Sequence, residues 1–509
     1  MDGVEDIPRE PTGVPGFDLL LGGGLPKGRS VLVTGTAGSG KTVLAAQFIA
    51  EGIRAHDAPG VFVTLEETPE AIITNTKGLG FGVDELIEQG QLRFVDASLA
   101  STGPEMVVGE YELDPLLHRI DHAVQATGAK RVAIDAVNML FDRYQDAAQV
   151  RQILFRISQF FKDRKITSLL TTQRVDESGP ISLHGVEEFV ADGVLVLRNE
   201  LAMENRRRTV EVLKLRGGHH IAGQHPFTIL PQQGIRVLPM TAARLDAPSS
   251  ETRMTSGTSD LDAMLGGGLL KGSIVLVTGP TGAGKTVMST IFATGLGEDE
   301  ARCTYFTFEE SVSQLSRNAR SYGVDLEGAM DAGRLRIQAS YPESKSLDQH
   351  FLELQASIEQ EQPDRIVIDS LSALDKVAPE RTFREFIIGL TDLIKRNGIT
   401  AFVTSSGPLF QGAGDSITRQ HISTLTDVVI VLRVVERAGR TEHAMSVLKM
   451  RGSPHDRAIR RFTISEDGVD LHETYHGLTG ILRGMATPLA DHGEDGREPQ
   501  LRDRPIDPR

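Results

Sequence analysis

The sequence has little of the chemistry that marks disulfide-stabilised proteins. It contains one cysteine, Cys303, in 509 residues. An internal disulfide framework is therefore impossible, and a reducing compartment is expected. Cys303 lies in the apolar run CTYFTF, so we expect its side chain to be buried and to act as a small hydrophobic group rather than as a reactive thiol.

Long apolar runs and basic charge are also scarce. No run reaches the roughly 18–20 apolar residues that a membrane span needs. The start, MDGVEDIPRE, lacks the basic and apolar regions of a secretion signal, so we expect a cytoplasmic protein. The net charge of −15 and the pI of about 5.5 weigh against a dedicated nucleic-acid binder, whose affinity comes largely from Lys and Arg. A local basic loop could still bind nucleic acid in an acidic protein.

The clearest positive feature is a duplication. TGVPGFDLLLGGGLPKGRSVLVTGTAGSGKT (12–42) returns as SGTSDLDAMLGGGLLKGSIVLVTGPTGAGKT (256–286). This spacing far exceeds the roughly 20–50 residues of stacked repeats, so it indicates a duplicated domain. We predict a first domain at 1–246, a second at 247–484, and a polar, Pro-rich tail at 485–509 that is disordered.

The apolar pattern predicts an α/β fold in each half. Short β-branched runs, apolar throughout, alternate with helix-like segments such as TVLAAQFIAEGI. Strands that are apolar throughout are typical of a parallel sheet buried on both faces, with helices flanking it. We expect each sheet to be closed by a strand pair such as VVIVLRVV and AMSVLKMR.

Two segments match the phosphate-binding P-loop pattern G-x-x-x-x-G-K-[ST]. Each follows the apolar strand VLVT and opens a helix, where backbone N–H groups face phosphates. The lysines should contact the β and γ phosphates, and the threonines should ligate Mg²⁺. The predicted nucleotide-binding residues are Gly35, Thr36, Ala37, Gly38, Ser39, Gly40, Lys41 and Thr42, and Gly279, Pro280, Thr281, Gly282, Ala283, Gly284, Lys285 and Thr286.

Carboxylates follow two further strands in each half. Asp135 and Asp369 end the apolar strands RVAI and RIVI, where a Walker-B carboxylate acts on the metal or its water. The pairs Glu66–Glu67 and Glu309–Glu310 follow the strand after each P-loop helix, beside the ligand crevice of a parallel sheet. One Glu of each pair should face the phosphate and orient water or accept a proton. Strand-end capping for the Asp residues, and solvated charge for the Glu pairs, are the simpler alternatives.

A repeated K-x-R-G segment ends the last strand of each half. Lys214-Leu215-Arg216 and Lys449-Met450-Arg451 place two cations on one face of a strand, where both could reach one anion. A cation supplied from a neighbouring subunit would act as an arginine finger on the γ-phosphate. Surface charge is the alternative, and the residues alone do not decide between them.

Together, the duplicated TG-x-x-G-x-D-x-x-L-GGGL-x-KG leaders, P-loops, Glu-Glu pairs and K-x-R-G strands resemble those of KaiC, the RecA-like ATPase family of the circadian clock. The resemblance spans about 10–484 and is densest in the second half, through SITRQHISTLTD and VLKMRGSPHDRAIRRFTIS. It implies two tandem RecA-like domains, assembly as a homohexamer of two stacked rings, and ATP with Mg²⁺ between subunits.

The resemblance also implies a role for individual residues. Glu66 matches the residue that positions hydrolytic water, and Glu309 matches the base that deprotonates an acceptor hydroxyl. Glu67 and Glu310 complete the predicted catalytic pairs. Thr42, Asp135, Thr286, Asp369 and Glu309 are the predicted metal site. The residues expected to reach a neighbour's ATP are Lys214, Leu215, Arg216, His220, Lys449, Met450, Arg451, Ser453 and His455.

The two halves differ at the predicted phospho-acceptors. Ser423 and Thr424 match the family's adjacent acceptors and Thr418 a minor third, whereas Glu188 and Phe189 stand opposite Ser423 and Thr424 in the first half. Glu and Phe cannot accept a phosphoryl group in this way, so the resemblance makes the first half an ATPase and the second an autokinase and autophosphatase. Turn or capping hydroxyls are the alternative for the Ser-Thr pair.

Some positions depart from the family. Lys376 stands where KaiC has an Arg near the transferred phosphate and lacks the planar guanidinium, and Pro454 replaces an aromatic residue. The tail shares little with the segment that binds the activator KaiA, so we expect phosphorylation without it. A KaiB-like partner stays open.

Three hypotheses follow. The first is a KaiC-like autokinase and ATPase acting as a timing hub, and the second is a non-rhythmic signalling ATPase of the same kind. The third is a RecA-like nucleic-acid-dependent ATPase, for which RNELAMENRRR (198–208), an expected hairpin tip, is the strongest basic cluster. The sequence does not give the rhythm, the oligomer number or the order of phosphorylation of Ser423 and Thr424.

Overall fold

The computed structural model describes residues 7–98, 113–141, 147–182, 185, 187–202, 205–238, 250–295, 301–406, 425–437, 439–475, 478–483 and 487–488. Ser423, Thr424 and Thr418 lie outside these residues, as does most of the predicted tail. The described residues group into two compact units: 1–247 with 341–360 and 374–396, and the remainder up to 509. The sequence-based boundaries at 246 and 484 stay predictions.

The first half contains a nine-stranded sheet. The five ladders that join β8, β3, β7, β6, β4 and β5 are parallel, and β9, β10 and β11 close the sheet in antiparallel fashion. The spatial order is β11 (Gly234–Val237), β10 (Gln224–Leu230), β9 (Asn205–Leu215), β8 (Gly193–Ala202), β3 (Ser30–Gly35), β7 (Thr167–Gln173), β6 (Arg131–Asp135), β4 (Gly60–Thr64) and β5 (Leu92–Asp96).

The second half repeats this topology. The strands of its nine-stranded sheet run in the order β16 (Leu335–Ala339), β15 (Cys303–Thr307), β17 (Arg365–Asp369), β18 (Thr400–Ser406), β14 (Ile274–Gly279), β19 (Val428–Arg437), β20 (Arg440–Met450), β21 (Arg460–Ser465) and β22 (Gly468–Thr474). The expected closing pair, β19 and β20, is antiparallel. The prediction of two α/β domains, each with a mostly parallel sheet, is therefore confirmed.

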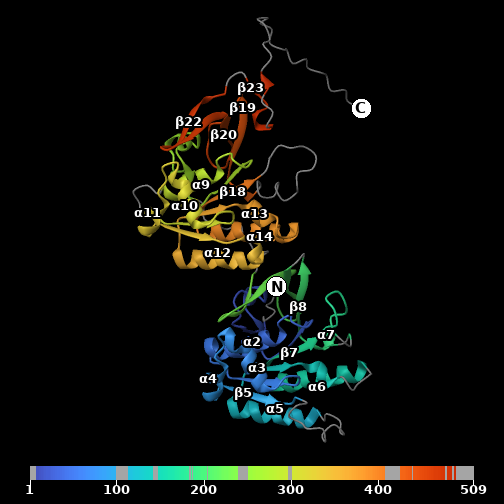
Figure 1. Ribbon diagram of the computed structural model, residues 1–509. Helices are drawn as coiled ribbons and strands as arrows, with labels where there is room; N and C mark the ends of the chain where they lie inside the picture. The colour runs from blue at the N-terminus through green and yellow to red at the C-terminus, as the bar shows by residue number, and fades with distance from the viewer. Residues whose placement is uncertain are drawn as a thin grey trace, which may run out of the picture. The chain divides into compact units, whose positions relative to one another are not determined.

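The helices of the first half cover both faces of its sheet (Figure 1). They are α1 (Phe17–Leu20), α2 (Lys41–His56), α3 (Pro69–Thr76), α4 (Val83–Glu88), α5 (Leu113–Thr127), α6 (Ala147–Asp163) and α7 (Glu187–Val190). Those of the second half are α8 (Ser259–Met264), α9 (Lys285–Thr294), α10 (Val312–Arg320), α11 (Leu326–Asp331), α12 (Leu347–Glu361), α13 (Leu371–Asp375) and α14 (Glu380–Arg396). No described helix is both long and apolar enough to cross a membrane.

Continuous apolar strands explain why both faces of the first sheet need helices. In β3, Val31 and Val33 pack in the core cluster that includes α2, whereas Leu32 between them packs in the cluster that includes α5 and α6. Successive strand side chains point to opposite faces, so an unbroken apolar run requires burial on each. Cys303, at the start of β15, is buried as expected, and burial raises the pKa of its thiol to about 12.

Short leader strands fasten the start of each half. β1 (Arg9–Glu10) pairs with β2 (Leu25–Pro26), and β12 (Arg253–Met254) pairs with β13 (Leu269–Leu270). The Asp repeated in both leaders is structural in each half, because Asp18 accepts from Thr12 N at 2.7 Å and Asp262 accepts from Ser256 N at 2.7 Å.

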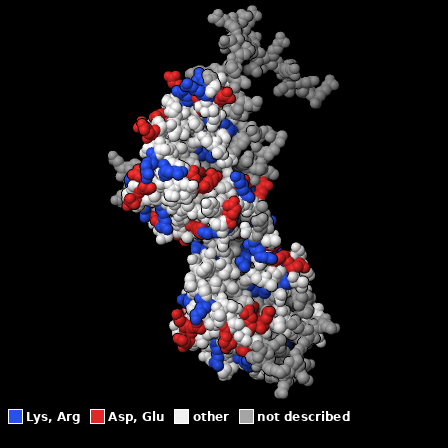
Figure 2. All heavy atoms as spheres, in the orientation of Figure 1, with Lys and Arg blue, Asp and Glu red and all other residues white. Residues whose placement is uncertain are grey.

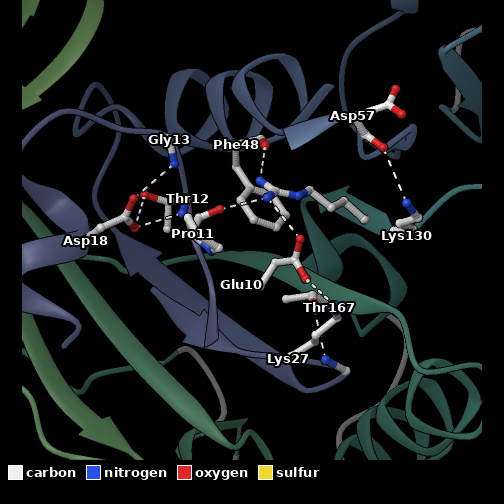
Figure 3. Close-up of polar contacts among 12 residues, drawn as sticks. Glu10, Pro11, Thr12, Gly13, Asp18, Lys27, Phe48, Asp57, Lys130 and Thr167 are labelled. Atoms are coloured by element: carbon white, nitrogen blue, oxygen red, sulfur yellow. Dashed lines mark hydrogen bonds and ion pairs between the residues drawn. The ribbon is translucent and has the colours of Figure 1, made fainter. Parts of the chain in front are cut away.

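A fully buried arginine ties the first leader to the sheet. Arg131, at the start of β6, has an exposed side-chain fraction of 0%. Its guanidinium donates to Glu10 Oε1 at 3.0 Å, to Pro11 O at 2.7 Å and to Phe48 O at 3.1 Å, the three acceptors labelled in Figure 3. Burial lowers the pKa of Arg131, and the Glu10 carboxylate acts against that shift. In the second half Arg365 donates to Phe292 O at 2.9 Å, and Met254 stands where Glu10 would be.

Replacing Glu10 with Met, the residue of the second half, is expected to lower the free energy of unfolding of the first half by about 3 kcal/mol, because a buried cation loses its counter-charge. Urea denaturation of the full chain measures the change. Glu51→Ala is the matched control: it removes a 3.8 Å ion pair with a partly exposed Arg54 and should cost below about 1 kcal/mol. Equal losses in both variants would contradict a stabilising Glu10–Arg131 pair.

Candidate active sites

Each P-loop joins a central strand to the start of a helix. The first runs from the end of β3 to Lys41 at the start of α2, and the second from the end of β14 to Lys285 at the start of α9. Gly38 and Gly40 have φ of 73° and 98°, a left-handed conformation that side chains with a Cβ rarely adopt. The sequence therefore folds into a loop whose backbone N–H groups lie at a helix N-terminus, as an anion site requires.

The P-loop lysines fold over their own loops. Lys41 Nζ donates to Gly35 O and Thr36 O, both at 2.9 Å, and Lys285 Nζ donates to Gly279 O at 2.9 Å and Pro280 O at 3.0 Å. Both ammonium groups are thus held at the centre of the loop by carbonyl oxygens, which bear no net charge.

Burial lowers the pKa of both lysines, and nearby carboxylates oppose the shift. For Lys41 these are Asp135, Glu66 and Glu177, and for Lys285 they are Asp369 and Glu309. The lysines, the strand-end Asp residues and the first predicted Glu of each pair therefore lie close enough to interact. This is the grouping that the P-loop pattern and the strand-end carboxylates predict.

The strand-end carboxylates meet the P-loop hydroxyls. Thr42 Oγ1 donates to Asp135 Oδ2 at 2.7 Å, and Thr171 Oγ1 donates to the other oxygen of Asp135. A Thr hydroxyl paired with a carboxylate provides the oxygen ligands that suit Mg²⁺, which is usually completed by substrate phosphates and water. The described residues contain no cluster of three His, Cys, Asp or Glu side chains that could cage a metal alone, and this donor set fits Mg²⁺ held together with a nucleotide.

Asp369 has an additional donor in the second half. Thr404 Oγ1 donates to Asp369 Oδ1 at 2.5 Å, and Tyr305 OH donates to Oδ2 at 2.9 Å. Burial raises the pKa of Asp369, and the hydrogen bonds from Thr404, Tyr305 and Thr286 act against that shift. Burial also raises the pKa of Tyr305 well above its usual range, so its hydroxyl stays a donor to the carboxylate.

The two glutamates of each pair have separate partners. Glu67 Oε2 accepts from Asn75 Nδ2 at 3.0 Å, and Glu310 Oε2 accepts from Asn318 Nδ2 at 3.2 Å. Both Asn residues lie on the following helix, α3 or α10. Glu66 and Glu309 are the members that interact with the P-loop lysines. One glutamate per pair therefore interacts with the P-loop lysine, and the other accepts a hydrogen bond from the following helix.

A single hydroxyl distinguishes the two facing glutamates. Ser370 Oγ donates to Glu309 Oε1 at 2.7 Å. At the equivalent place after Asp135 the first half has Ala136, and Glu66 accepts no hydrogen bond from any described residue. Ser370 is not among the residues predicted from the sequence, although the residues after the two strand-end Asp positions, Ser370 and Ala136, differ visibly in the sequence.

The K-x-R-G lysines bind the chain segment next to the acceptor positions. Lys214 Nζ donates to Glu188 O at 3.0 Å and Ala191 O at 2.8 Å, at the end of α7. Lys449 Nζ donates to Thr426 O at 2.6 Å. Burial lowers the pKa of both lysines, and the neighbouring Arg216 or Arg451 lowers it further. Each lysine therefore holds the segment of its own half that comes just before β8 or β19.

The other residues predicted to contact nucleotide differ in burial and in hydrogen bonding. Leu215 and Met450 are buried and His220 is half-buried, whereas the side chains of Arg216 and Arg451 are exposed. Ser453 Oγ accepts from Arg253 at 2.6 Å. The ring Nε2 of His455 is buried and has no hydrogen-bond partner among the described residues. Lys376, exposed, follows α13.

Side chains of the hairpin strands also reach the P-loops. Arg208 Nε lies 3.1 Å from Gly38 O, and His443 Nε2 lies 3.1 Å from Gly282 O. The expected hairpin of RNELAMENRRR is confirmed as β8 and β9, with Arg206 bonded to Asn199 O at 2.9 Å. On the face seen in Figure 2, basic and acidic side chains are interspersed.

Comparison with known proteins agrees with this geometry. The family model described as "ATPase: KaiC" matches residues 10–242 and again 254–476. The circadian clock protein KaiC3 of Synechocystis is 46% identical over 488 residues, covering 96% of this chain and 95% of the relative. The circadian clock oscillator protein KaiC of Parathermosynechococcus lividus is 46% identical over 486 residues, covering 96% and 89%.

A third relative gives the same result. The circadian clock oscillator protein KaiC of Synechococcus elongatus is 45% identical over 478 residues, covering 94% of this chain and 92% of the relative. Similarity thus extends through both sheets and both P-loops rather than to one domain alone. The chain therefore belongs to the KaiC family of ATPases and carries the family's ATPase domain twice.

Proposed function

We propose that this protein is a cytoplasmic ATP-dependent serine/threonine autokinase, autophosphatase and ATPase in which the two halves do different chemistry. As a KaiC-family ATPase, the chain binds ATP. The first half hydrolyses ATP, and the second transfers the γ-phosphoryl group to its own hydroxyls. Because the named relatives are clock proteins, we further propose that the protein serves as a timing or signalling hub.

The observation that carries the proposal is the placement of Glu309. It lies near Lys285 and Asp369 at the P-loop of the second half, the half that has adjacent hydroxyls at Ser423 and Thr424. A carboxylate close to the phosphate site can accept a proton from an attacking hydroxyl. The equivalent segment of the first half offers Glu188 and Phe189 instead.

Transfer of the γ-phosphoryl group in the second half forms one bond to phosphorus and breaks one. The hydroxyl oxygen of Ser423 or Thr424 forms a bond to the γ-phosphorus, while the bond from that phosphorus to the β–γ bridging oxygen breaks and ADP leaves. The hydroxyl proton passes to Glu309. Lys285 pairs with the phosphate charge. Thr286 and Asp369 would hold Mg²⁺, which neutralises developing charge on the phosphates when bound.

The first half has equivalent phosphate- and metal-binding residues but a different acceptor for the phosphoryl group. Lys41, Thr42 and Asp135 repeat the phosphate and metal residues, and Glu66 carries the free carboxylate. With no hydroxyl at the equivalent of Ser423 or Thr424, water is the acceptor, and Glu66 orients it. Hydrolysis then yields ADP and inorganic phosphate.

A phosphoryl group on Ser423 or Thr424 would change the contacts that neighbouring residues make. It adds nearly two negative charges and three acceptor oxygens, and Lys449 already binds Thr426 O in this segment. A new anion near this lysine and the exposed Arg451 changes which contacts they favour, which is how a modification becomes a signal.

We further propose assembly as a homohexamer of two stacked rings with ATP between subunits. Leu213 and Leu448, equivalent residues of β9 and β20, have exposed fractions of 44% and 41%. Apolar side chains repeated on the strands that carry the K-x-R-G cations suit a contact with a second copy. Arg216 and Arg451 would then reach a neighbour's γ-phosphate. A KaiB-like partner is compatible with the family, whereas dependence on a KaiA-type activator is not expected.

Incubation of the full chain with ATP labelled in its γ-phosphate tests the function and the need for metal. With Mg²⁺ we expect label on protein as well as released phosphate. Because the metal neutralises phosphate charge in both sites, EDTA should reduce both products about 100-fold or more. Released phosphate without labelled protein would leave a tandem ATPase. Stimulation by single-stranded DNA, with a salt-dependent gel shift, would favour the nucleic-acid alternative instead.

A further inference from the structure

Two strand ends bring Ser370 and Glu309 together in the second half. β15 and β17 are parallel neighbours, with Thr307 opposite Asp369, so the residues that follow both strands meet at one edge of the sheet. Ser370, 1% exposed, is fixed in the protein, whereas Glu309 is exposed. The 2.7 Å hydrogen bond from Ser370 Oγ to Glu309 Oε1 is the contact by which the buried residue holds the exposed one.

The same edge in the first half shares its backbone and Glu–Asn contacts, but it lacks the Ser370 hydroxyl and has Phe62 in place of Tyr305, whose hydroxyl bonds to Asp369. Leu65 N donates to Asp135 O at 2.8 Å, and Phe308 N donates to Asp369 O at 2.8 Å. The second glutamate of each pair is held by an Asn in both halves. The facing glutamates differ because Ala136 has no side-chain hydroxyl to donate to Glu66.

We propose that Ser370 is a positioning residue that fixes Glu309 for proton transfer from a hydroxyl carried on the protein itself. This inference rests on the autokinase function proposed above. The Ser370 bond occupies Oε1, and no described residue donates to Oε2, which is left to accept the proton. A hydrogen bond to an ionised carboxylate is among the stronger kinds, and it restricts a side chain that would otherwise sample several rotamers.

The two acceptors explain why one half needs this bond. Water is small and can approach a carboxylate from several directions, so Glu66 can orient it from more than one rotamer. A Ser or Thr hydroxyl is attached to the chain and approaches from one direction. Its base must therefore be in place beforehand, since misplacement by about 1 Å can cost roughly 100-fold in rate.

The test is the rate of autophosphorylation of full-length Ser370→Ala at saturating Mg-ATP. We expect the rate constant to fall roughly 10- to 100-fold, while the ATP concentration for half-maximal rate changes less than about twofold. Ser370→Thr keeps the donor and should restore the rate to within about threefold of wild type. Ser370→Cys, a weak donor of similar size, should behave like Ser370→Ala and guards against a folding defect of the alanine variant.

A double variant shows whether Ser370 acts through Glu309. In a Glu309→Gln background, adding Ser370→Ala should change the remaining rate less than about twofold, because the position of residue 309 no longer matters once it cannot take the proton. A purely structural role would slow both backgrounds equally.

Three results would overturn the inference. They are a wild-type rate in both Ser370→Ala and Ser370→Cys, an equal loss in the two backgrounds, and phosphate found on Ser370 itself. Each of these leaves the autokinase proposal intact. Absence of phosphoprotein from the wild type would instead overturn that proposal, and this inference with it.

Discussion

Glu309→Gln is expected to slow autophosphorylation about 100- to 10,000-fold, the range that a positioned general base contributes. Glutamine has nearly the shape of glutamate and can still accept from Ser370, but its amide cannot take the proton of an attacking hydroxyl. Because Glu309 interacts electrostatically with Lys285, removing its charge should leave ATP binding intact or strengthen it slightly. Phosphate-affinity gels of the variant with Mg-ATP, read over time, measure the rate.

The matched control is Glu310→Gln on the neighbouring residue. Glu310 bonds to Asn318 at 3.2 Å rather than facing Lys285, and an amide can replace a carboxylate in that contact. Its rate should stay close to wild type. If Glu310→Gln lost phosphorylation and Glu309→Gln kept it, the assignment of the facing carboxylate would be reversed.

The second large effect is expected in the other half. Glu66→Gln should reduce ATP hydrolysis by the first half about 100-fold or more, because water loses the carboxylate that orients and deprotonates it. The measurement uses a Glu309→Gln background, so that released phosphate reports mainly the first P-loop. Glu67→Gln, whose carboxylate bonds to Asn75 at 3.0 Å, is the control.

Phosphorylation gives this experiment a second readout. The single variant Glu66→Gln should retain autophosphorylation, since the acceptors and Glu309 belong to the second half. Loss of both products in Glu66→Gln, with an oligomeric state equal to that of wild type, would show that the two sites do not divide the chemistry in this way.

The parts of the sites that could be predicted from the sequence are those set by residues close together along the chain. The P-loops, the strand-end residues Asp135 and Asp369, and the closing strand pair follow from strand–loop–helix order, because local geometry fixes where such residues lie. That only one glutamate of each pair interacts with the P-loop lysine is consistent with the alternation of an extended segment.

Contacts between segments far apart in the sequence could not be predicted in this way. The bond from Ser370 to Glu309 depends on the register of β15 against β17, and that of Tyr305 to Asp369 depends on the same ladder. The bonds of Arg208 and His443 to the P-loops depend on how far each hairpin extends. No periodicity in a single chain encodes these distances.

The central claim is that the second half transfers phosphate to Ser423 and Thr424. It is tested most directly by mapping phosphopeptides of the full chain after incubation with Mg-ATP, beside Ser423→Ala/Thr424→Ala. The account predicts phosphate on these two residues in wild type and none on the segment in the double variant, with ATP hydrolysis by the first half retained. Equal phosphorylation of both proteins, or hydrolysis without any phosphopeptide, would contradict it.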